Sequence, residues 1–244
     1  MKAICIIPAK KLSKRMPNKN IKSFLGLPMI AHVIKNIKKS RCFGEIIVST
    51  DSKKIKKISE MHGAKVPFLR GKKLSNEYTT TNDVIIDVIK KLEKNRRLDL
   101  ICCIYPTSIF ASPLVIRKAF KILKNKKVKF VFSAKKYEHP MQRGFYIDKR
   151  KITLLKKKNL NKRTQDFRDL YYDAGQIYLS NYKNFLNKKN QFNLPSKPII
   201  FKRFQSIDID NKENFLVAKK IILNNLHLYW LWKKLDLRIW KDLF

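Results

Sequence analysis

Acidic residues are scarce in this chain. Only 18 of its 244 residues are Asp or Glu, against 56 Lys and Arg, so the formal net charge is +38. A charge of this size attracts polyanions such as nucleic acid, anionic membranes or nucleotide phosphates. The lysines are spread along the whole chain rather than gathered in one stripe. We therefore interpret most of them as solvated surface charge and expect no specific nucleic-acid partner.

Cysteine and long apolar runs are scarce as well. The four cysteines (Cys5, Cys42, Cys102 and Cys103) form no CxxC pair, which argues against a disulfide framework or a zinc site. We expect buried free thiols in a reducing compartment, the cytoplasm. No run of about 18 apolar residues occurs, so no membrane span is predicted, and the apolar stretch 3–7 is too short for a signal peptide.

Short apolar runs alternate with helical patterns through the first half of the chain. The predicted strands cover residues 3–8, 45–50, 98–105 and 129–133, and the predicted helices cover 29–39, 53–61, 79–92 and 113–123. Continuous apolar strands between amphipathic helices predict an α/β fold, with a Rossmann-like, mostly parallel sheet that has helices on both faces. Ligands of such sheets bind beyond the carboxyl ends of the strands.

The alternation weakens after about residue 134. Segments 143–155, 174–180 and 198–204 predict a small antiparallel extension, and a helix follows at 211–224. The tail at 226–244 is aromatic and basic, with apolar residues at helical spacing. We favour packing of this tail helix against protein, its own domain or a dimer partner, over contact with an anionic membrane surface.

The first loop, residues 8–20, follows the first predicted strand directly. Backbone N–H groups in a strand–loop–helix unit favour anions, and Lys10, Lys14, Arg15 and Lys19 could hold a polyphosphate. No GxxxxGK[ST] motif occurs, so this is not an ordinary P-loop. The alternative is a solvated basic loop.

Two carboxylates near the end of the chain, Asp208 and Asp210, stand out because acidic residues are few. At positions i and i+2 of an extended segment they point to one side, and hard oxygen ligands suit Mg²⁺. Asp210 could instead be the N-cap of the following helix.

Two further segments carry candidate contacts. In RTQDFRDLYYDAGQ, residues 163–176, the glycine predicts a close approach to a ligand, and a plain loop entering a strand explains the pattern equally well. The threonines at 79–81 could cap the helix that follows them, or their hydroxyls could bind a base or ribose.

In order and spacing, these pieces resemble the acylneuraminate cytidylyltransferase family over roughly residues 1–224. The family's opening IPARxxSKRxPxKN is IPAKKLSKRMPNKN here, and its DID metal pair is Asp208-Ile209-Asp210. Between them lie Arg70, then Leu74-Ser75 with the hydroxyl cluster 79–81, and the strand end Tyr105-Pro106-Thr107-Ser108. The segments VSTD, KVPFLR, TTTNDV, CCIYPTS, PMQR, RTQD and DAGQIY resemble the branch that acts on pseudaminic acid.

The resemblance implies an enzyme that transfers CMP from CTP to a nine-carbon acidic sugar and releases pyrophosphate, for surface glycans or flagellin. It implies a nucleotide-diphospho-sugar transferase fold over residues 1–225, Mg²⁺ as cofactor, and a homodimer with residues 135–180 at the interface. It makes Lys19, Asp208 and Asp210 the catalytic set, with the two carboxylates on the metal. Nucleotide contacts fall to Lys10, Ser13, Lys19, Asn20, Arg70, Thr79, Thr81 and Tyr105. Sugar contacts fall to Gln142, Arg143, Arg163 and Gln176.

The chain departs from the family pattern at several positions. Lys10 replaces the usual Arg, Lys11-Leu12 replaces a small pair, and Glu77 stands where Asp is common. Tyr105 stands where the sialic acid branch usually has Gln. The alternatives are a sialic or legionaminic acid substrate, a non-catalytic relative and, more distantly, a basic nucleic-acid-binding protein.

Overall fold

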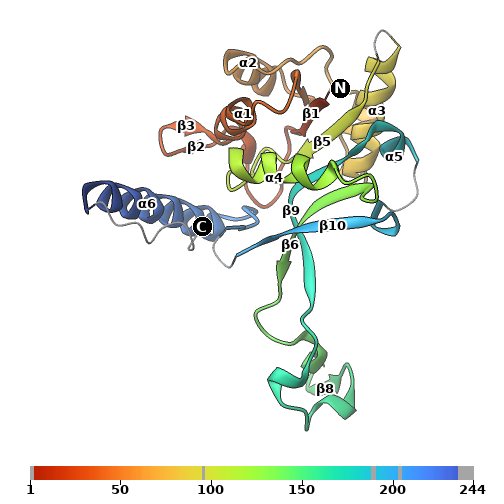
Figure 1. The fold of residues 1–244 in the computed structure, drawn as a ribbon, viewed down its shortest axis with the longest axis vertical. Helices are drawn as coiled ribbons and strands as arrows, with labels where there is room; N and C mark the ends of the chain where they lie inside the picture. Colours follow the sequence, from red (N-terminus) through yellow and green to blue (C-terminus); the bar gives the residue numbers. More distant parts are fainter. Residues whose placement is uncertain (1–2, 95–96, 188–190, 203–204, 236–244) are drawn as a thin grey trace.

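A six-stranded sheet forms the centre of the molecule (Figure 1). The computed structural model describes residues 3–94, 97–187, 191–202 and 205–235. In spatial order the strands are β10 (Ser196–Phe201), β6 (Phe130–Lys136), β9 (Tyr171–Asn181), β5 (Leu100–Ile104), β1 (Ala3–Pro8) and β4 (Glu45–Ser49).

The predicted, mostly parallel sheet is confirmed. Strand β1 pairs in parallel with β4 and β5, and β10 pairs in parallel with β6. Strand β9 lies antiparallel between β5 and β6. The placement of 174–180 and 198–204 in a separate extension is wrong, because 174–180 lies in β9 and 198–201 lies in β10, both strands of the main sheet. Residues 203–204 lie outside the described residues. Ile177 and Leu179 are 0% exposed, as expected for a central strand.

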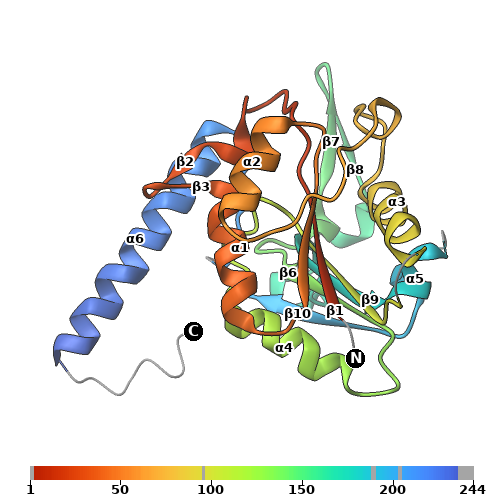
Figure 2. The ribbon, with the colours of Figure 1, turned by 90° about the horizontal axis from the view of Figure 1, so that it is seen from above.

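Helices cover both faces of the sheet, as predicted. Helices α1 (Met29–Ser40), α2 (Lys53–Met61) and α4 (Pro113–Leu123) lie on one face, and α3 (Thr81–Glu93) and α5 (Tyr182–Leu186) on the other (Figure 2). The side chains of β1 alternate between them. Cys5 and Ile7 pack with α1 and α4, whereas Ile4 and Ile6 pack with α3. Burial on both faces explains why the strand is apolar without interruption.

Side-chain caps fix the starts of three helices. Ser52 accepts a hydrogen bond from the amide of Ile55 in α2, and Ser112 accepts one from Val115 in α4. Thr80 and Asp83 form a reciprocal capping box at α3. These caps supply partners for amides that the first helical turn leaves unpaired.

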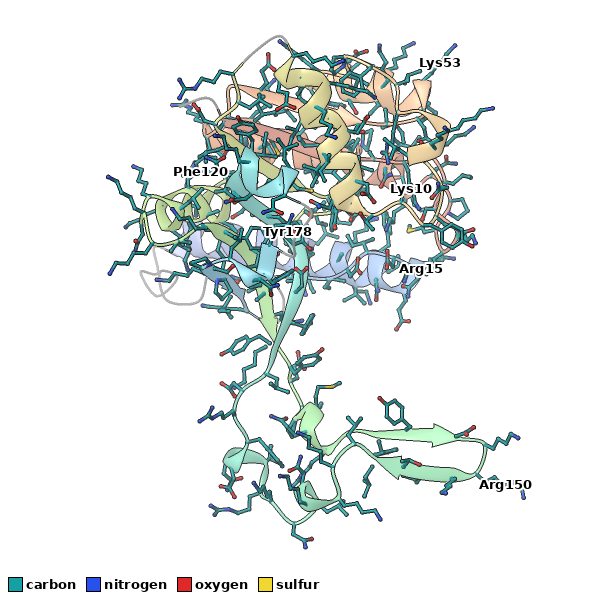
Figure 3. The ribbon with its side chains drawn as sticks, turned by 90° about the vertical axis from the view of Figure 1, so that its right-hand side faces the viewer. Lys10, Arg15, Lys53, Phe120, Arg150 and Tyr178 are labelled. Atoms are coloured by element: carbon teal, nitrogen blue, oxygen red, sulfur yellow. The ribbon has the colours of Figure 1, made fainter. Side chains whose placement is uncertain are left out.

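Strands β6 and β9 carry a projection, residues 137–170, which we call the arm (Figures 1 and 3). It contains the hairpin of β7 (Phe145–Asp148) and β8 (Lys151–Leu154), and Arg150 lies at the hairpin tip (Figure 3). The predicted antiparallel extension is therefore confined to the arm. A second small hairpin joins β2 (Ser23–Phe24) and β3 (Leu27–Pro28).

Helix α6 (Lys212–Leu235) follows the sheet. Phe215 and Ala218 are buried on the α1 face of the core, and the Phe215 ring meets Phe24 edge-on at 5.3 Å. The sequence predicted two segments, 211–224 and 226–244, but one helix continues through to Leu235, and 236–244 lie outside the described residues. Among the described residues, no helix combines the length and apolar character that crossing a membrane requires.

Candidate active site

The basic loop, residues 9–20, follows the carboxyl end of β1. Side-chain hydrogen bonds to its backbone hold it in place. The amide of Lys11 donates to Oδ1 of Asp51 at 2.7 Å, and Nδ2 of Asn20 donates to the carbonyl oxygen of Lys10 at 2.9 Å. Asn20 is itself buried, at 7% exposure. In this structure, the predicted nucleotide residue therefore stabilises the conformation of the loop.

The loop borders a cavity of about 850 Å³. The cavity lies beyond the carboxyl ends of β1 and β5, where ligands of parallel sheets bind. Predicted site residues from three distant parts of the sequence line it: Lys10, Ser13, Lys19, Asn20, Tyr105, Asp208 and Asp210. The residues that share the lining are Pro8, Leu12, Lys14, Arg15, Ser75, Asn76, Glu77, Tyr78, Pro106 and Thr107.

The acidic pair is anchored by the residue between the two carboxylates. Ile209 is 0% exposed, which holds the segment in the core and turns Asp208 and Asp210 to the cavity. Asp210 does not cap helix α6. Asn211 does so, because its Oδ1 accepts the amide of Asn214 at 2.8 Å.

Two cations from the basic loop hold Asp210. Nζ of Lys19 donates to Oδ1 of Asp210 at 2.7 Å, and the Arg15 guanidinium pairs with Oδ2. Partial burial and the neighbouring Asp210 carboxylate raise the pKa of Asp208. Burial alone would raise the pKa of Asp210 too, but Lys19 and Arg15 hold it below its ordinary value. Asp210 is therefore the more readily ionised member of the pair.

The opposite rim consists of residues 75–78. The Lys14 ammonium pairs with the Glu77 carboxylate across the mouth of the cavity. The side chain of Asn76 shapes this rim, because its Oδ1 accepts the amides of Tyr78 and Thr79, each at 2.9 Å. Hydrogen bonding to Lys14 lowers the pKa of Glu77.

Tyr105 lies at the end of β5 and is braced from three sides. Its hydroxyl donates to Oγ1 of Thr81 at 3.1 Å, and its ring meets Tyr178 edge-on at 5.8 Å. Gly175, at φ +61°, passes close enough that an added Cβ would lie 3.7 Å from the ring. The close approach predicted at Gly175 is therefore made to Tyr105. Burial raises the pKa of Tyr105 to about 12.

The other predicted nucleotide residues lie behind the cavity rather than on its lining. Arg70 is 7% exposed, and its Nη2 donates to the carbonyl oxygen of Ser49 at 2.5 Å. Burial lowers the pKa of Arg70. Oγ1 of Thr79 donates to Asn76 at 2.9 Å, and Thr81 accepts from Tyr105. Thr80, between them, caps the helix.

The predicted sugar residues are not brought to this cavity. Gln142, Arg143 and Arg163 lie in the arm, where Arg163 pairs with Asp166 at 3.0 Å. Gln176, in β9 beside β6, is 3% exposed. Its amide donates to Oγ of Ser133 at 2.9 Å and its Nε2 to the carbonyl of Ala174 at 3.2 Å.

A model of the cytidylyltransferase family matches residues 4–226. The chain belongs to the cytidylyltransferase family.

Curated relatives of this cytidylyltransferase agree with that assignment. A pseudaminic acid cytidylyltransferase of Campylobacter jejuni is 35% identical over 221 residues, which cover 90% of this chain and 95% of the relative. A CMP-N,N'-diacetyllegionaminic acid synthase of Legionella pneumophila is 34% identical, with coverage of 91% and 97%. An N-acylneuraminate cytidylyltransferase of Escherichia coli is 27% identical and covers 89% of this chain and 51% of the relative.

Solved structures confirm the fold. A CMP:2-keto-3-deoxy-manno-octonic acid synthetase complexed with CTP superimposes with a TM-score of 0.67 at 14% identity, covering 92% of this chain and 100% of the other. A 4-diphosphocytidyl-2C-methyl-D-erythritol synthase from Anaerococcus prevotii gives 0.62 at 16% identity, with coverage of 91% and 99%.

The cytidylyltransferase departs from its family pattern without crowding the loop. Lys11 and Leu12 replace a small pair, but both are exposed, Leu12 at 72%. Met16 anchors the middle of the loop in the core at 4% exposure. Lys11 therefore lies off the cavity, Leu12 borders it while staying largely exposed, and the backbone keeps its hydrogen bonds.

Sequence reasoning missed the rim residues Asn76 and Tyr78, and it left the partner of Arg15 open. The signal for the rim was the polar run SNEYTTT after Arg70, in which an Asn precedes hydroxyl residues and favours a side-chain-stabilised turn. No local pattern could pair Arg15 with Asp210, because the two residues are far apart in the chain.

Proposed function

We propose that this cytidylyltransferase transfers CMP from CTP to pseudaminic acid and releases pyrophosphate. The observation that carries the proposal is the cavity in which Lys19, Arg15 and the Asp208/Asp210 pair converge. The choice of sugar is supported by the 35% identical relative named for pseudaminic acid. Legionaminic acid is the second candidate, supported by the 34% identical relative named for that product.

In the proposed reaction, the anomeric hydroxyl oxygen of the sugar attacks the α-phosphorus of CTP. A new P–O bond forms, the bond to the β-phosphate breaks, and the hydroxyl proton leaves to solvent. Negative charge on the phosphoryl oxygens is what the site must stabilise. Lys10, Lys14, Arg15 and Lys19 border the cavity and supply fixed positive charge for it.

The acidic pair fits a Mg²⁺ ion. Two carboxylates in contact, next to a site for triphosphate, are a hard oxygen donor set of the kind that binds Mg²⁺ together with substrate phosphates and water. After burial, the neighbouring Asp210 carboxylate raises the pKa of Asp208, and a cation between the two carboxylates would relieve that repulsion. We propose that Asp208 and Asp210 hold Mg²⁺, which, when bound, neutralises phosphate charge. In the same proposal, Lys19 exchanges its contact with Asp210 for a substrate phosphate.

We further propose that the protein acts as a homodimer joined through the arm. In the hairpin register, Phe145 lies opposite Leu154 and Ile147 opposite Ile152, so one face is apolar. Phe145, Ile147 and Ile152 are 52%, 70% and 62% exposed. A two-stranded hairpin is marginal by itself in water, so an exposed apolar face of this kind needs a partner.

A second copy would also explain the predicted sugar residues of the arm. Gln142, Arg143 and Arg163 line no part of the cavity described above. The arm that carries them projects away from the rest of the protein, which contains the cavity (Figure 3). We propose that each arm presents these side chains to the cavity of the other protomer, where a guanidinium matches the sugar carboxylate.

The proposal is tested with a panel of sugars. The purified protein is incubated with CTP, Mg²⁺ and, separately, pseudaminic, legionaminic and N-acetylneuraminic acid. Pyrophosphate release and the CMP-sugar mass are then followed. We expect the highest kcat/KM with pseudaminic acid. A higher value with legionaminic acid would transfer the assignment to that sugar, and no turnover with any of them would identify a non-catalytic relative.

A further inference from the structure

Ser49, Thr50 and Asp51, where β4 ends, contact both the basic loop and the segment that carries Arg70. The carbonyl oxygen of Ser49 accepts the amide of Ala9 at 2.9 Å and Nη2 of Arg70 at 2.5 Å. The carbonyl of Thr50 accepts the amide of Arg70 at 2.8 Å. The basic loop and the segment that carries Arg70 are therefore attached to the same strand end.

Within this junction, the Asp51 side chain interacts with both the basic loop and Arg70. Its Oδ1 accepts the amide of Lys11 at 2.7 Å, in the middle of the stretch from Lys10 to Leu12. Lys10 and Leu12 line the cavity, but Lys11 and Asp51 do not. A hydrogen bond at Lys11 thus sets the direction of its two neighbours without occupying the cavity itself.

The same carboxylate lies near the buried guanidinium of Arg70. Burial lowers the pKa of Arg70, and the negative charges of Asp51 and Asp87 act in the opposite direction. The guanidinium donates to carbonyl oxygens, to Ser49 at 2.5 Å and to Leu74 at 3.5 Å. A buried cation held mainly by carbonyls is stabilised further by nearby anions.

We propose that Asp51 is a positioning residue for the nucleotide site, which fixes the basic loop through Lys11 and supports Arg70 with the same carboxylate. This inference rests on the proposed function, because it assigns Asp51 to the binding of CTP. Asp51 acts through Lys10 and Arg70, so its removal changes the affinity for CTP more than the rate of the bound complex.

Three variants separate the two contributions. Asp51→Ala removes both the acceptor and the charge. Asp51→Asn keeps an oxygen that can accept the Lys11 amide and removes only the charge. Asp87→Asn is the matched control, since Asp87 also lies near Arg70, but it stands on α3, pairs with Lys91 at 2.8 Å and does not hold the basic loop.

The measurements are KM for CTP, kcat, and the dissociation constant of CTP by calorimetry, each on the full chain. We expect Asp51→Ala to raise KM and the dissociation constant at least tenfold, with kcat within threefold of the wild type. Asp87→Asn should stay within threefold on every quantity. Asp51→Asn should fall between Asp87→Asn and Asp51→Ala, because it keeps an acceptor for the Lys11 amide and loses only the charge near Arg70. Mere loss of folded protein would lower the apparent kcat and leave KM unchanged. If Asp51→Ala does not fold, Asp51→Ser replaces it, because a serine hydroxyl is too short to reach the Lys11 amide.

Two results would overturn the inference in an active enzyme: equal KM values for Asp51→Ala and Asp87→Asn, or an Asp51→Asn value as high as that of Asp51→Ala. A wild type that neither binds CTP nor turns it over would instead refute the proposed function, and the inference would fall with it.

Discussion

Single charges decide how the candidate site works at the scale of the residue. Asp210 meets Lys19 and Arg15, both from a loop almost the whole chain away in sequence, and Asp208 stands beside it. Because Lys19 and Asp210 are each about one-sixth exposed, at 17% and 16%, their interaction is screened less than a surface pair. In the proposed function, Lys19 exchanges this contact for a phosphate of the substrate.

Asp210→Asn tests this exchange. The substitution keeps the shape of the side chain but removes the charge that holds Lys19 and, as proposed, Mg²⁺. Loss of such an electrostatic contribution should lower kcat by roughly 10²–10³-fold. Steady-state kinetics at saturating CTP measure it, and Asp87→Asn on α3 serves as the control. An unchanged kcat would remove Asp210 from the catalytic set.

In the exposed Lys14–Glu77 pair, removal of the carboxylate charge should improve CTP binding, whereas at Asp210 it should impair catalysis. Glu77 is a negative charge at the mouth of a cavity that must admit a triphosphate, and Lys14 keeps it ionised by lowering its pKa. Glu77→Gln should therefore lower KM for CTP by about two- to fivefold at low salt, and the gain should vanish near 0.5 M salt, where the Debye length is only a few ångströms. A KM that rises or a gain that persists at high salt would contradict this.

Tyr105 makes stability depend on pH at the alkaline end. Burial raises its pKa to about 12, against an unfolded value of about 10. The neutral phenol is favoured in the fold, so its contribution is fully present below about pH 10 and is lost as pH rises through about 12. In Tyr105→Phe, the fall of the unfolding free energy over this range should be shallower, as followed by denaturant titration at several pH values. An identical fall of the unfolding free energy with pH in the wild type and the variant would show that the Tyr105 hydroxyl is not shielded from solvent.

At the scale of the element, the sequence predicted what local patterns control. Helices at 53–61 and 113–123 match α2 and α4 at both ends, because serine caps and apolar spacing act within a few residues. The membership of β9 and β10 in the main sheet could not be predicted, since pairing depends on which distant edge is free. The same reason hid the ion pairs of Asp210 with Lys19 and Arg15. Asn211 could have been recognised as the cap only by knowing what its neighbour binds.

The apolar face of the arm hairpin carries the prediction at this scale. Ile147→Lys, at a side chain 70% exposed on that face, should convert the proposed dimer to a monomer. Tyr146→Lys is the matched control, because Tyr146 is 65% exposed but points to the other face of the hairpin. Light scattering coupled to size exclusion measures the mass. Dimers in both variants, or a wild-type monomer, would rule out the hairpin as the interface.

At the scale of the whole molecule, the family and the fold could be predicted from the sequence. The separation of the site residues into those that line the cavity and those that support it could not. Motif order along residues 1–224 identified a cytidylyltransferase, and the family match over 4–226 confirms it. The sequence did not reveal that some predicted site residues border the cavity while others brace it. Arg70 and Gln176 are 7% and 3% exposed, a distinction that emerges only when strands from the whole chain are assembled.

The net charge of +38 also belongs to the whole molecule. It raises the local concentration of any anionic substrate, and the four cations of the basic loop that line the cavity focus that field there. The acidic pair within this field is what separates a catalytic site from a general binder of anions.

The most direct test of the account is formation of the CMP-sugar from CTP and pseudaminic acid with Mg²⁺, followed by mass spectrometry for the wild type and for Asp208→Asn and Asp210→Asn. The account predicts CMP-pseudaminic acid and equimolar pyrophosphate with the wild type, and a fall of at least about 10²-fold in both variants. No product from the wild type, or equal product from the variants, would contradict it.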